Sequence, residues 1–243
     1  MSWEKFAFVT DVHGDMQDSA SVTAFHKFCA MWKPTVRVCG GDAWDFRAIR
    51  KGASEEEKRD SMTRDYEMGW EFLEAFKPTV FLQGNHDMRL FDLAKEDRGV
   101  VSDFAAMCVK DINRKLTAMK CKSLEYDRRR GVFELGKLRM VHGFGGGGKT
   151  MARTHANAYG HVLMGHSHAI DYFSSPSLDG RFGMSVGCMC DLDMGYLHSS
   201  IGSLAHANGW AYGAVNTRTG DFKVWQAEKI AGKFVVTGEP IFL

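Results

Sequence analysis

The feature that most limits the possible folds is a unit that the sequence repeats. Residues 33–36 and 77–80 both read Lys-Pro-Thr-Val, and each follows a stretch with apolar residues at helical spacing. A short apolar run comes next and then a polar cluster, Gly40-Gly41-Asp42 in the first unit and Gly84-Asn85-His86 in the second. This order is typical of an α/β sheet whose crossovers are helices. Ligands bind such sheets at the carboxyl ends of the strands, so a site is expected there.

Further elements can be predicted from periodicity and capping residues. The run Ser54-Glu55-Glu56-Glu57 is a capping box and predicts the start of a helix that continues to Phe76. One helical segment is expected over residues 89–122, and another from about Thr150 to Tyr159. In the C-terminal part, alternating apolar residues predict strands at 182–190, 210–216 and 222–226.

A chain of 243 residues fits one large domain or two small ones, and because the sequence shows no linker, low-complexity tract or domain boundary, we expect a single domain covering residues 1–243. With 44% hydrophobic and 25% charged residues, the chain can bury a substantial core. The net charge of +1 provides no overall field that would favour nucleic acid or membrane. Because we find no signal-peptide pattern and no apolar run of membrane length, we expect a cytoplasmic location. The six cysteines are expected to be reduced thiols that pack as small hydrophobes. No sequence pattern indicates the oligomeric state.

Polar side chains follow several predicted strands in blocks that share one chemistry. A lone histidine at a strand end is more often structural, but five such blocks in order are hard to explain by turn chemistry. Together they offer carboxylate, imidazole and amide ligands without thiolate. Such a set suits Mn, Fe, Zn, Ni or Co at a hydrolytic centre. The blocks are Asp11-x-His13, Gly41-Asp42, Gly84-Asn85-His86-Asp87, His142-Gly143 and Gly165-His166-Ser167-His168.

The ordered blocks resemble the motif pattern of the calcineurin-like metallophosphoesterases, from Asp11 to His168. The resemblance implies a four-layer α/β/β/α sandwich of two mixed sheets flanked by helices, with the C-terminal strands in the second sheet. It also implies two divalent transition-metal ions, Mn being our first choice. The first ion would be held by Asp11, His13, Asp42 and His168. The second would be held by Asp42, Asn85, His142 and His166, so that Asp42 bridges the two with its two oxygens.

The resemblance also implies a mechanism for a phosphate-ester substrate. Two cations lower the pKa of a bridging water from about 16 toward about 7, and the resulting hydroxide attacks phosphorus. His86 is the candidate general acid for the leaving oxygen. Asp45, three residues after the bridging aspartate, is the candidate that orients His86. The competing role for His86 is purely electrostatic.

Departures from the family pattern indicate the phosphodiesterase and nuclease branch rather than the protein Ser/Thr phosphatases. The third block ends in Asp87 where those phosphatases have glutamate, and Arg47 comes one position late. Arg47 is therefore a candidate either for substrate binding or for a salt bridge elsewhere. The expected substrates are phosphodiesters or phosphomonoesters. Basic residues around 110–130 keep an Mre11-like DNA nuclease as an alternative, although the net charge does not indicate a nucleic-acid partner.

Two readings from other classes are also open. Residues Gly143 to Thr150 match the P-loop pattern G-x-x-x-x-G-K-[ST] between a predicted strand and a predicted helix, which would make the chain an NTPase. Against this, His142 already belongs to the five blocks, and glycine is abundant. Alternatively, the loop lies close to the metals and Lys149 binds substrate. The second reading from another class is a catalytically silent scaffold, which the intact set of ligand positions disfavours.

Overall fold

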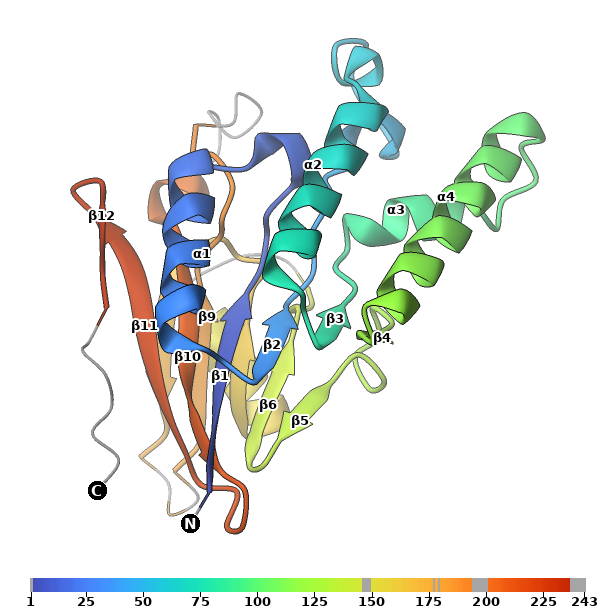
Figure 1. The fold of residues 1–243 in the computed structure, drawn as a ribbon. Coiled ribbons are helices and arrows are strands. Elements are labelled where there is room, and N and C mark those ends of the chain that lie inside the picture. The colour runs from blue at the N-terminus through green and yellow to red at the C-terminus, as the bar shows by residue number, and fades with distance from the viewer. Residues whose placement is uncertain (1, 146–149, 177, 179, 194–200, 237–243) are drawn as a thin grey trace.

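The protein consists of two β-sheets packed face to face between outer helices (Figure 1). The computed structural model describes residues 2–145, 150–176, 178, 180–193 and 201–236. Mixed parallel and antiparallel pairing occurs in both sheets, which confirms the predicted α/β/β/α fold class. The helices are α1 (Ser19–Trp32), α2 (Met62–Phe76), α3 (Asp87–Leu93), α4 (Val100–Ala118) and α5 (Met151–Tyr159).

The larger sheet has the strand order β12-β11-β10-β1-β2-β3-β4. Strands β1 to β4 are parallel, as the repeated helix–strand unit predicts. The expectation that the C-terminal strands belong to the second sheet is correct for the strand predicted at 182–190, which pairs in the smaller sheet as β9. It is wrong for those predicted at 210–216 and 222–226, because β10 pairs antiparallel with β1 and β11 pairs with β10. The strands of the larger sheet are β1 (Trp3–Val9), β2 (Val36–Cys39), β3 (Val80–Leu82), β4 (Lys122–Leu124), β10 (Gly209–Asn216), β11 (Phe222–Ile230) and β12 (Lys233–Val235).

The smaller sheet has the order β5-β6-β7-β9-β8 and lies behind the larger one in Figure 1. An apolar core that includes Phe8, Val38 and Leu163 fills the space between the two sheets. Helix α5 covers the outer face of the smaller sheet, where Met151 and Ala156 pack against β6 and β7. The strands are β5 (Phe133–Leu135), β6 (Leu138–Val141), β7 (His161–Met164), β8 (Ile170–Ser174) and β9 (Phe182–Val186).

Helices α1 and α2 cover the outer face of the larger sheet, and the lysine of each Lys-Pro repeat ends one of them. Lys33 and Lys77 both have φ 53°, the left-handed conformation of a helix C-terminus, and proline follows each. Ser54 and Glu57 do form the predicted capping box, but it opens only the 3-10 turn Glu57–Arg59. Helix α2 begins later, because Ser61 caps it through the backbone nitrogen of Arg64.

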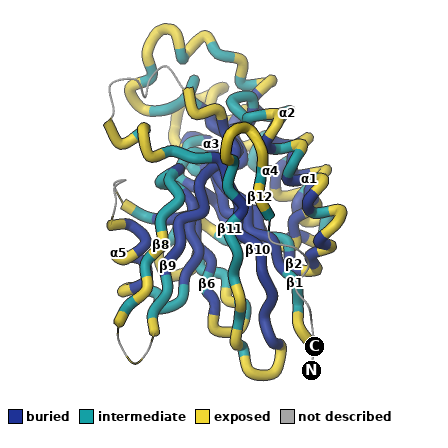
Figure 2. The backbone as a smooth tube through the Cα atoms, turned by 90° about the vertical axis from the view of Figure 1, so that its left-hand side faces the viewer, coloured by how far each residue is buried: buried dark blue, intermediate teal, exposed yellow. Residues whose placement is uncertain are grey.

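The single helix expected over residues 89–122 is wrong in extent. It is divided into α3 and α4, which are separated by a segment that contains Gly99 with φ 57°. Figure 2 shows that central strands such as β6, β9 and β10 are largely buried, whereas β8, β11 and β12 and the outer surfaces of the helices are more exposed. Among the described residues, no helix combines the length and the apolar character that a membrane span requires.

Candidate metal centre

The seven predicted metal ligands lie on one rim, where parallel strands of both sheets end. Strands β1, β2 and β3 of the larger sheet end just before the first three blocks, and β6 and β7 of the smaller sheet end just before the last two. In five of these ligands the backbone is left-handed, with φ between 50° and 67°, which costs about 1–3 kcal/mol each in side chains other than glycine. These five are Asp11, His13, Asp42, His166 and His168.

Two glycines allow the strand ends to approach each other so closely. A Cβ atom at Gly84 would lie 2.1 Å from Oδ1 of Asp42. A Cβ atom at Gly165 would lie 2.4 Å from Oδ2 of Asp11. Both carboxylates would have to move, so glycine is required at both positions for the rim to keep its geometry.

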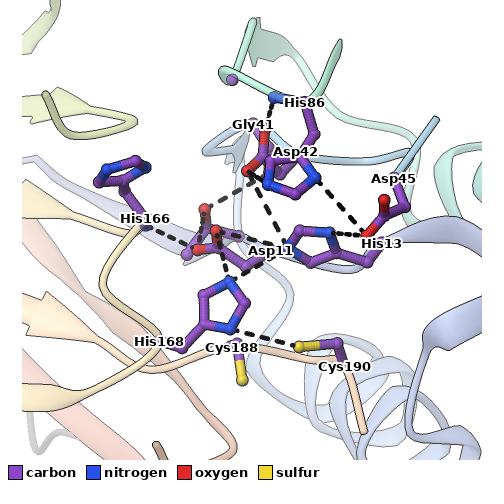
Figure 3. Close-up of polar contacts among 12 residues, drawn as sticks. Asp11, His13, Gly41, Asp42, Asp45, His86, His166, His168, Cys188 and Cys190 are labelled. Carbon is purple, nitrogen blue, oxygen red and sulfur yellow. Dashed lines mark hydrogen bonds and ion pairs between the residues drawn. The ribbon is translucent and has the colours of Figure 1, made fainter. Parts of the chain in front are cut away.

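The first group of ligands surrounds a point between Asp11, His13 and His168 (Figure 3). Nε2 of His13 lies 3.1 Å from Nε2 of His168, and 3.9 Å from Oδ1 of Asp11. Nε2 of His168 lies 3.4 Å from the same Asp11 oxygen. The other oxygen of Asp11 accepts hydrogen bonds from Thr10 Oγ1 and from the backbone nitrogen of His166. Oδ1 of Asp11 is buried, and it has no hydrogen-bond partner among the described residues.

The second group lies on the other side of Asp42. Oδ1 of Asn85 is 2.9 Å from Nε2 of His142 and 2.6 Å from Nδ1 of His166. Oδ2 of Asp42 is 3.3 Å from Nε2 of His142 and 4.0 Å from Nε2 of His13, so it faces both groups. Its other oxygen accepts a hydrogen bond from the backbone nitrogen of His86. Oδ2 of Asp42 would therefore be the atom that both groups share if each held a cation.

Each imidazole is held by the nitrogen that faces away from the rim. Nδ1 of His13 donates to Oδ2 of Asp45 at 3.0 Å, and Nδ1 of His142 donates to the carbonyl of Gly40 at 2.8 Å. Nε2 of His166 donates to the carbonyl of Gly145 at 2.7 Å. Nδ1 of His168 faces Sγ of Cys190 at 3.7 Å. Such outer contacts fix the tautomer, so the inward nitrogen presents a lone pair.

These donor atoms fit a pair of divalent cations. Ligand atoms about 2.1 Å from one ion occupy neighbouring corners roughly 3.0–3.5 Å apart, close to the spacings found here. Unprotonated nitrogens of His13 and His168 in contact repel each other unless a cation or a proton lies between them. The two groups would share Asp42, as the sequence predicts.

When no cation is bound, protons on the histidines balance the negative charge of the buried aspartates at the rim. Burial raises the pKa of Asp11, but His168 and His142 outweigh it and lower the value to about 2. Burial also opposes ionisation of Asp42, and His142 and His86 nevertheless hold its pKa well below the usual range. Burial lowers the pKa of His142, and Asp42 raises it to about 9. Protons on the imidazoles thus balance the buried carboxylates until metal replaces them.

The candidate acid His86 contacts an arginine that sequence reasoning missed. Oδ2 of Asp45 is 3.5 Å from Nδ1 of His86, but only 3.0 Å from Nδ1 of His13, so its closer partner is the predicted metal ligand His13. Nη1 of Arg89 donates to both the backbone carbonyl and Oδ1 of Asp45, and Nη2 lies 3.3 Å from Nε2 of His86. The spacing of three residues between His86 and Arg89 at the start of α3 was the available signal.

Two buried aspartates without an assigned role also support the rim. Asp87, the last residue of the third block, accepts hydrogen bonds from backbone nitrogens of the loops after β2 and β3. Asp65 on α2 accepts from the backbone nitrogens of Asp45 and Phe46, and burial raises its pKa to about 6. No sequence signal connected Asp65 with this site.

Of the two candidate substrate-binding residues, the structure describes only Arg47. Arg47 donates to Asp15 and Asp60, so the structure places it in the salt-bridge alternative. Lys149 lies outside the described residues. The strand and helix that the P-loop reading requires are present as β6 and α5, but residues 146–149 of the loop between them are not described. Tyr126 packs its ring against His142 and Phe144 beside the second ligand group.

The sequence itself matches no protein-family model and no curated protein. Among solved structures, a single mutant of Vps29 from Entamoeba histolytica is similar over 95% of this chain and 96% of that one, at 10% identity and a TM-score of 0.50. Vacuolar Protein Sorting 29 from Cryptosporidium parvum shows 12% identity over 97% and 96% of the chains, with a TM-score of 0.46. A Mycoplasma pneumoniae phosphatase shows 15% identity over 94% of each chain, with a TM-score of 0.45.

The fold and the rim together define a class. The chain has the calcineurin-like metallophosphoesterase fold, which the likeness to the Entamoeba protein shows. On that fold it carries clusters of histidine and aspartate with the geometry of a metal site. A likeness at 10% identity shows the fold alone, so the chemistry has to be argued from this chain's own residues.

Proposed function

We propose that the protein is a metal-dependent phosphoesterase that hydrolyses phosphodiester or phosphomonoester bonds. The observation that supports this most is the contact of 3.1 Å between Nε2 of His13 and Nε2 of His168. Beside it lies the buried Oδ1 of Asp11, which has no hydrogen-bond partner among the described residues. Donor atoms arranged in this way, on this fold, have a physical explanation in a bound cation.

The chain's own residues would divide the work. Two groups of four would hold the ions and share Asp42, and Mn²⁺ is the first choice among Mn, Fe, Zn, Ni and Co. When bound, the two divalent cations supply an activated water nucleophile and neutralise charge on the phosphate oxygens. The holding residues are Asp11, His13, Asp42 and His168 for one ion, and Asp42, Asn85, His142 and His166 for the other.

His86 would protonate the leaving oxygen. Its side chain is 18% exposed, so it can reach a substrate that lies over the rim. Asp45 and Arg89 flank its ring and limit the orientations that it can adopt. Of these two, Asp45 also holds the metal ligand His13, so a change at Asp45 would disturb both metal binding and proton transfer.

A substrate panel tests the proposal. The purified protein, loaded with Mn²⁺, is assayed with bis-p-nitrophenyl phosphate, p-nitrophenyl phosphate, cyclic nucleotides and single- and double-stranded DNA. Metal-dependent hydrolysis that disappears in Asp42→Asn supports it. If metal analysis shows no transition metal and no ester is hydrolysed with added Mn²⁺, the scaffold reading replaces it. Hydrolysis of DNA in preference to the small esters would favour the Mre11-like alternative.

The P-loop reading has its own test, because strand β6 and helix α5 flank that loop as an NTPase requires. Binding of ATP is measured with and without Mg²⁺. Micromolar, Mg²⁺-dependent affinity that survives His142→Ala would support an NTPase and oppose the phosphoesterase. Loss of phosphoesterase activity in the same variant, without such affinity for ATP, would support the proposal.

A further inference from the structure

A basic groove lies beside the metal centre. Its volume is about 740 Å³, which is in the range that holds a drug-sized or nucleotide-sized ligand. The described residues that line it include two carboxylates, Asp92 and Glu96, and five cations. The lining residues alone carry more positive than negative charge, although neighbouring carboxylates pair with Arg50, Lys58 and Arg89. The cations are Arg50, Lys51, Lys58, Arg89 and Arg98.

Arg89 belongs both to this groove and to the surroundings of the candidate acid. One of its terminal nitrogens is 3.3 Å from Nε2 of His86, and the other is bound to Asp45. Since His86 is the group that would protonate the leaving oxygen, the groove begins on the side of the leaving group. Whatever fills the groove would be attached to the oxygen that departs.

Three of the cations are available to a ligand, and Lys51 and Arg98 are the two on which the inference rests. Lys51 is exposed, and no ion pair among the described residues involves it. Arg98 pairs with Glu96 at 3.5 Å, with both side chains more than half exposed, and such a pair contributes little free energy. An arginine binds a phosphate through two parallel hydrogen bonds, so exchange of Glu96 for phosphate is favourable. The pair of Lys58 with Glu55 is likewise more than half exposed on both sides, so Lys58 is available in the same way. Arg50 is less accessible, because it is bound to Glu57, whose side chain is only 14% exposed.

We propose that the substrate is a phosphodiester whose leaving group carries at least one further phosphate, as an internal linkage of an oligonucleotide does. The further phosphate would bind Lys51 and Arg98 while the reacting phosphate faces the rim. This inference rests on the proposed function. It also differs from the expectation of a basic surface around residues 110–130, because that segment lines the groove at no described position.

Matched substrates and variants test it. Thymidylyl-thymidine has one phosphate, and the same dinucleotide with a phosphate at each end adds two. We expect the wild type to hydrolyse the second with the higher kcat/KM, mainly through KM. Lys51→Glu and Arg98→Glu should each reduce that preference about tenfold, because each removes a charged contact with phosphate. Both should leave hydrolysis of bis-p-nitrophenyl phosphate unchanged. Arg129→Glu, an exposed arginine outside the groove, is the matched control.

A binding measurement separates this inference from the proposed function. Fluorescence anisotropy of a labelled thymidine pentanucleotide needs no turnover, and the slope of log affinity against log salt should fall by about 0.7 for each phosphate contact removed. If no ester is hydrolysed but Lys51→Glu and Arg98→Glu still weaken binding, phosphate binding in the groove is supported and the proposed phosphoesterase activity is contradicted. If Lys51→Glu and Arg98→Glu affect both dinucleotides equally, or if Arg129→Glu has a larger effect than Arg98→Glu, the proposed phosphate site in the groove is contradicted.

Discussion

Oδ2 of Asp87 accepts hydrogen bonds from the backbone nitrogen of Asp42 at 2.9 Å and from that of Gly84 at 2.8 Å. Its other oxygen accepts from the backbone nitrogen of Trp44 at 3.2 Å. One carboxylate thus fixes the two loops that follow β2 and β3. Asp42, the proposed bridging aspartate, and Asn85 keep their positions partly through this residue.

The substitution Asp87→Asn should therefore destabilise the protein. Asparagine has the same shape but only one acceptor oxygen, so at least one buried N–H loses its partner. We expect the free energy of unfolding to fall by about 1–3 kcal/mol. Denaturant titration measures it, with Asp92→Asn as control, since Asp92 is an exposed carboxylate on the same helix. A similar loss in both variants would contradict the role given to Asp87.

The shared aspartate can be distinguished from an unshared one. Asp42→Asn should weaken both ions together, because Oδ2 of Asp42 faces both ligand groups. Asp11→Asn should weaken only the ion beside His13 and His168. Elemental analysis after dialysis against a graded chelator gives the metal content. Loss of one ion in Asp42→Asn, with the other retained, would exclude a bridging role.

The role of His86 in proton transfer can be tested separately from metal binding. His86→Ala should reduce turnover by about 10²–10⁴, the usual range for a general acid, while both ions remain. His161→Ala, which removes an imidazole on β7, serves as the control. Activity and metal content are measured on the same preparations. Full turnover in His86→Ala would remove this residue from the mechanism.

Metal binding should release protons. With a pKa raised to about 9 in the protein without metal, His142 carries a proton at pH 7, and so does His168, where Cys188 and Asp11 overcome burial and raise the pKa to about 9. A cation must displace these protons, so its affinity should increase as pH rises from about 6 to 9. Calorimetry in buffers of different ionisation enthalpy counts the protons. Release that is absent at pH 7 would contradict the raised pKa values.

Asp18 connects the start of α1 to β11. It caps the helix through the backbone nitrogen of Ser21, and Lys229 binds both its oxygens at 2.9 and 3.0 Å. Asp18→Ala should lower the free energy of unfolding by about 1–2 kcal/mol at pH 7. Asp18→Ser, which can still cap but cannot form the ion pair, should lose less.

The same pair has a defined pH dependence. Burial raises the pKa of Asp18, but the contacts with Ser21 and Lys229 outweigh it, so the folded value is below the unfolded one of 3.8. The stabilisation is therefore complete above about pH 4 and is lost as pH falls through the folded pKa. Thermal melts of wild type and Asp18→Ala should converge at low pH. A difference that persists unchanged at pH 2 would show that ionised Asp18 is not its cause.

Much of the fold could be predicted, because its signals are local. The proline after Lys33 or Lys77 ends a helix, an apolar run follows, and the strand end then carries polar residues. The pairing of β10 with β1 could not be predicted in this way, since residues about 200 positions apart leave no local signal. The start of α2 was misjudged because two capping residues, Ser54 and Ser61, compete within eight positions, and only the second opens a long helix.

The residues of the rim also divide into those with a local sequence signal and those without one. Its ligand positions follow strand ends and so could be inferred from motif order. Asp65 and Cys190 reach the site from elements without a motif, and their contribution depends on three-dimensional packing. Arg89 was within reach of the sequence, since a residue three positions after His86 on a helix lies on the same face.

The position of β1 in the middle of the larger sheet has a consequence for biosynthesis. As the chain leaves the ribosome, β2 can pair with one edge of β1 early, but β10 at residues 209–216 emerges last among the neighbours of that strand. Until then the strand that leads to Asp11 has one open edge. Nascent chains arrested before residue 209 should accordingly be more prone to aggregate than chains arrested after residue 216.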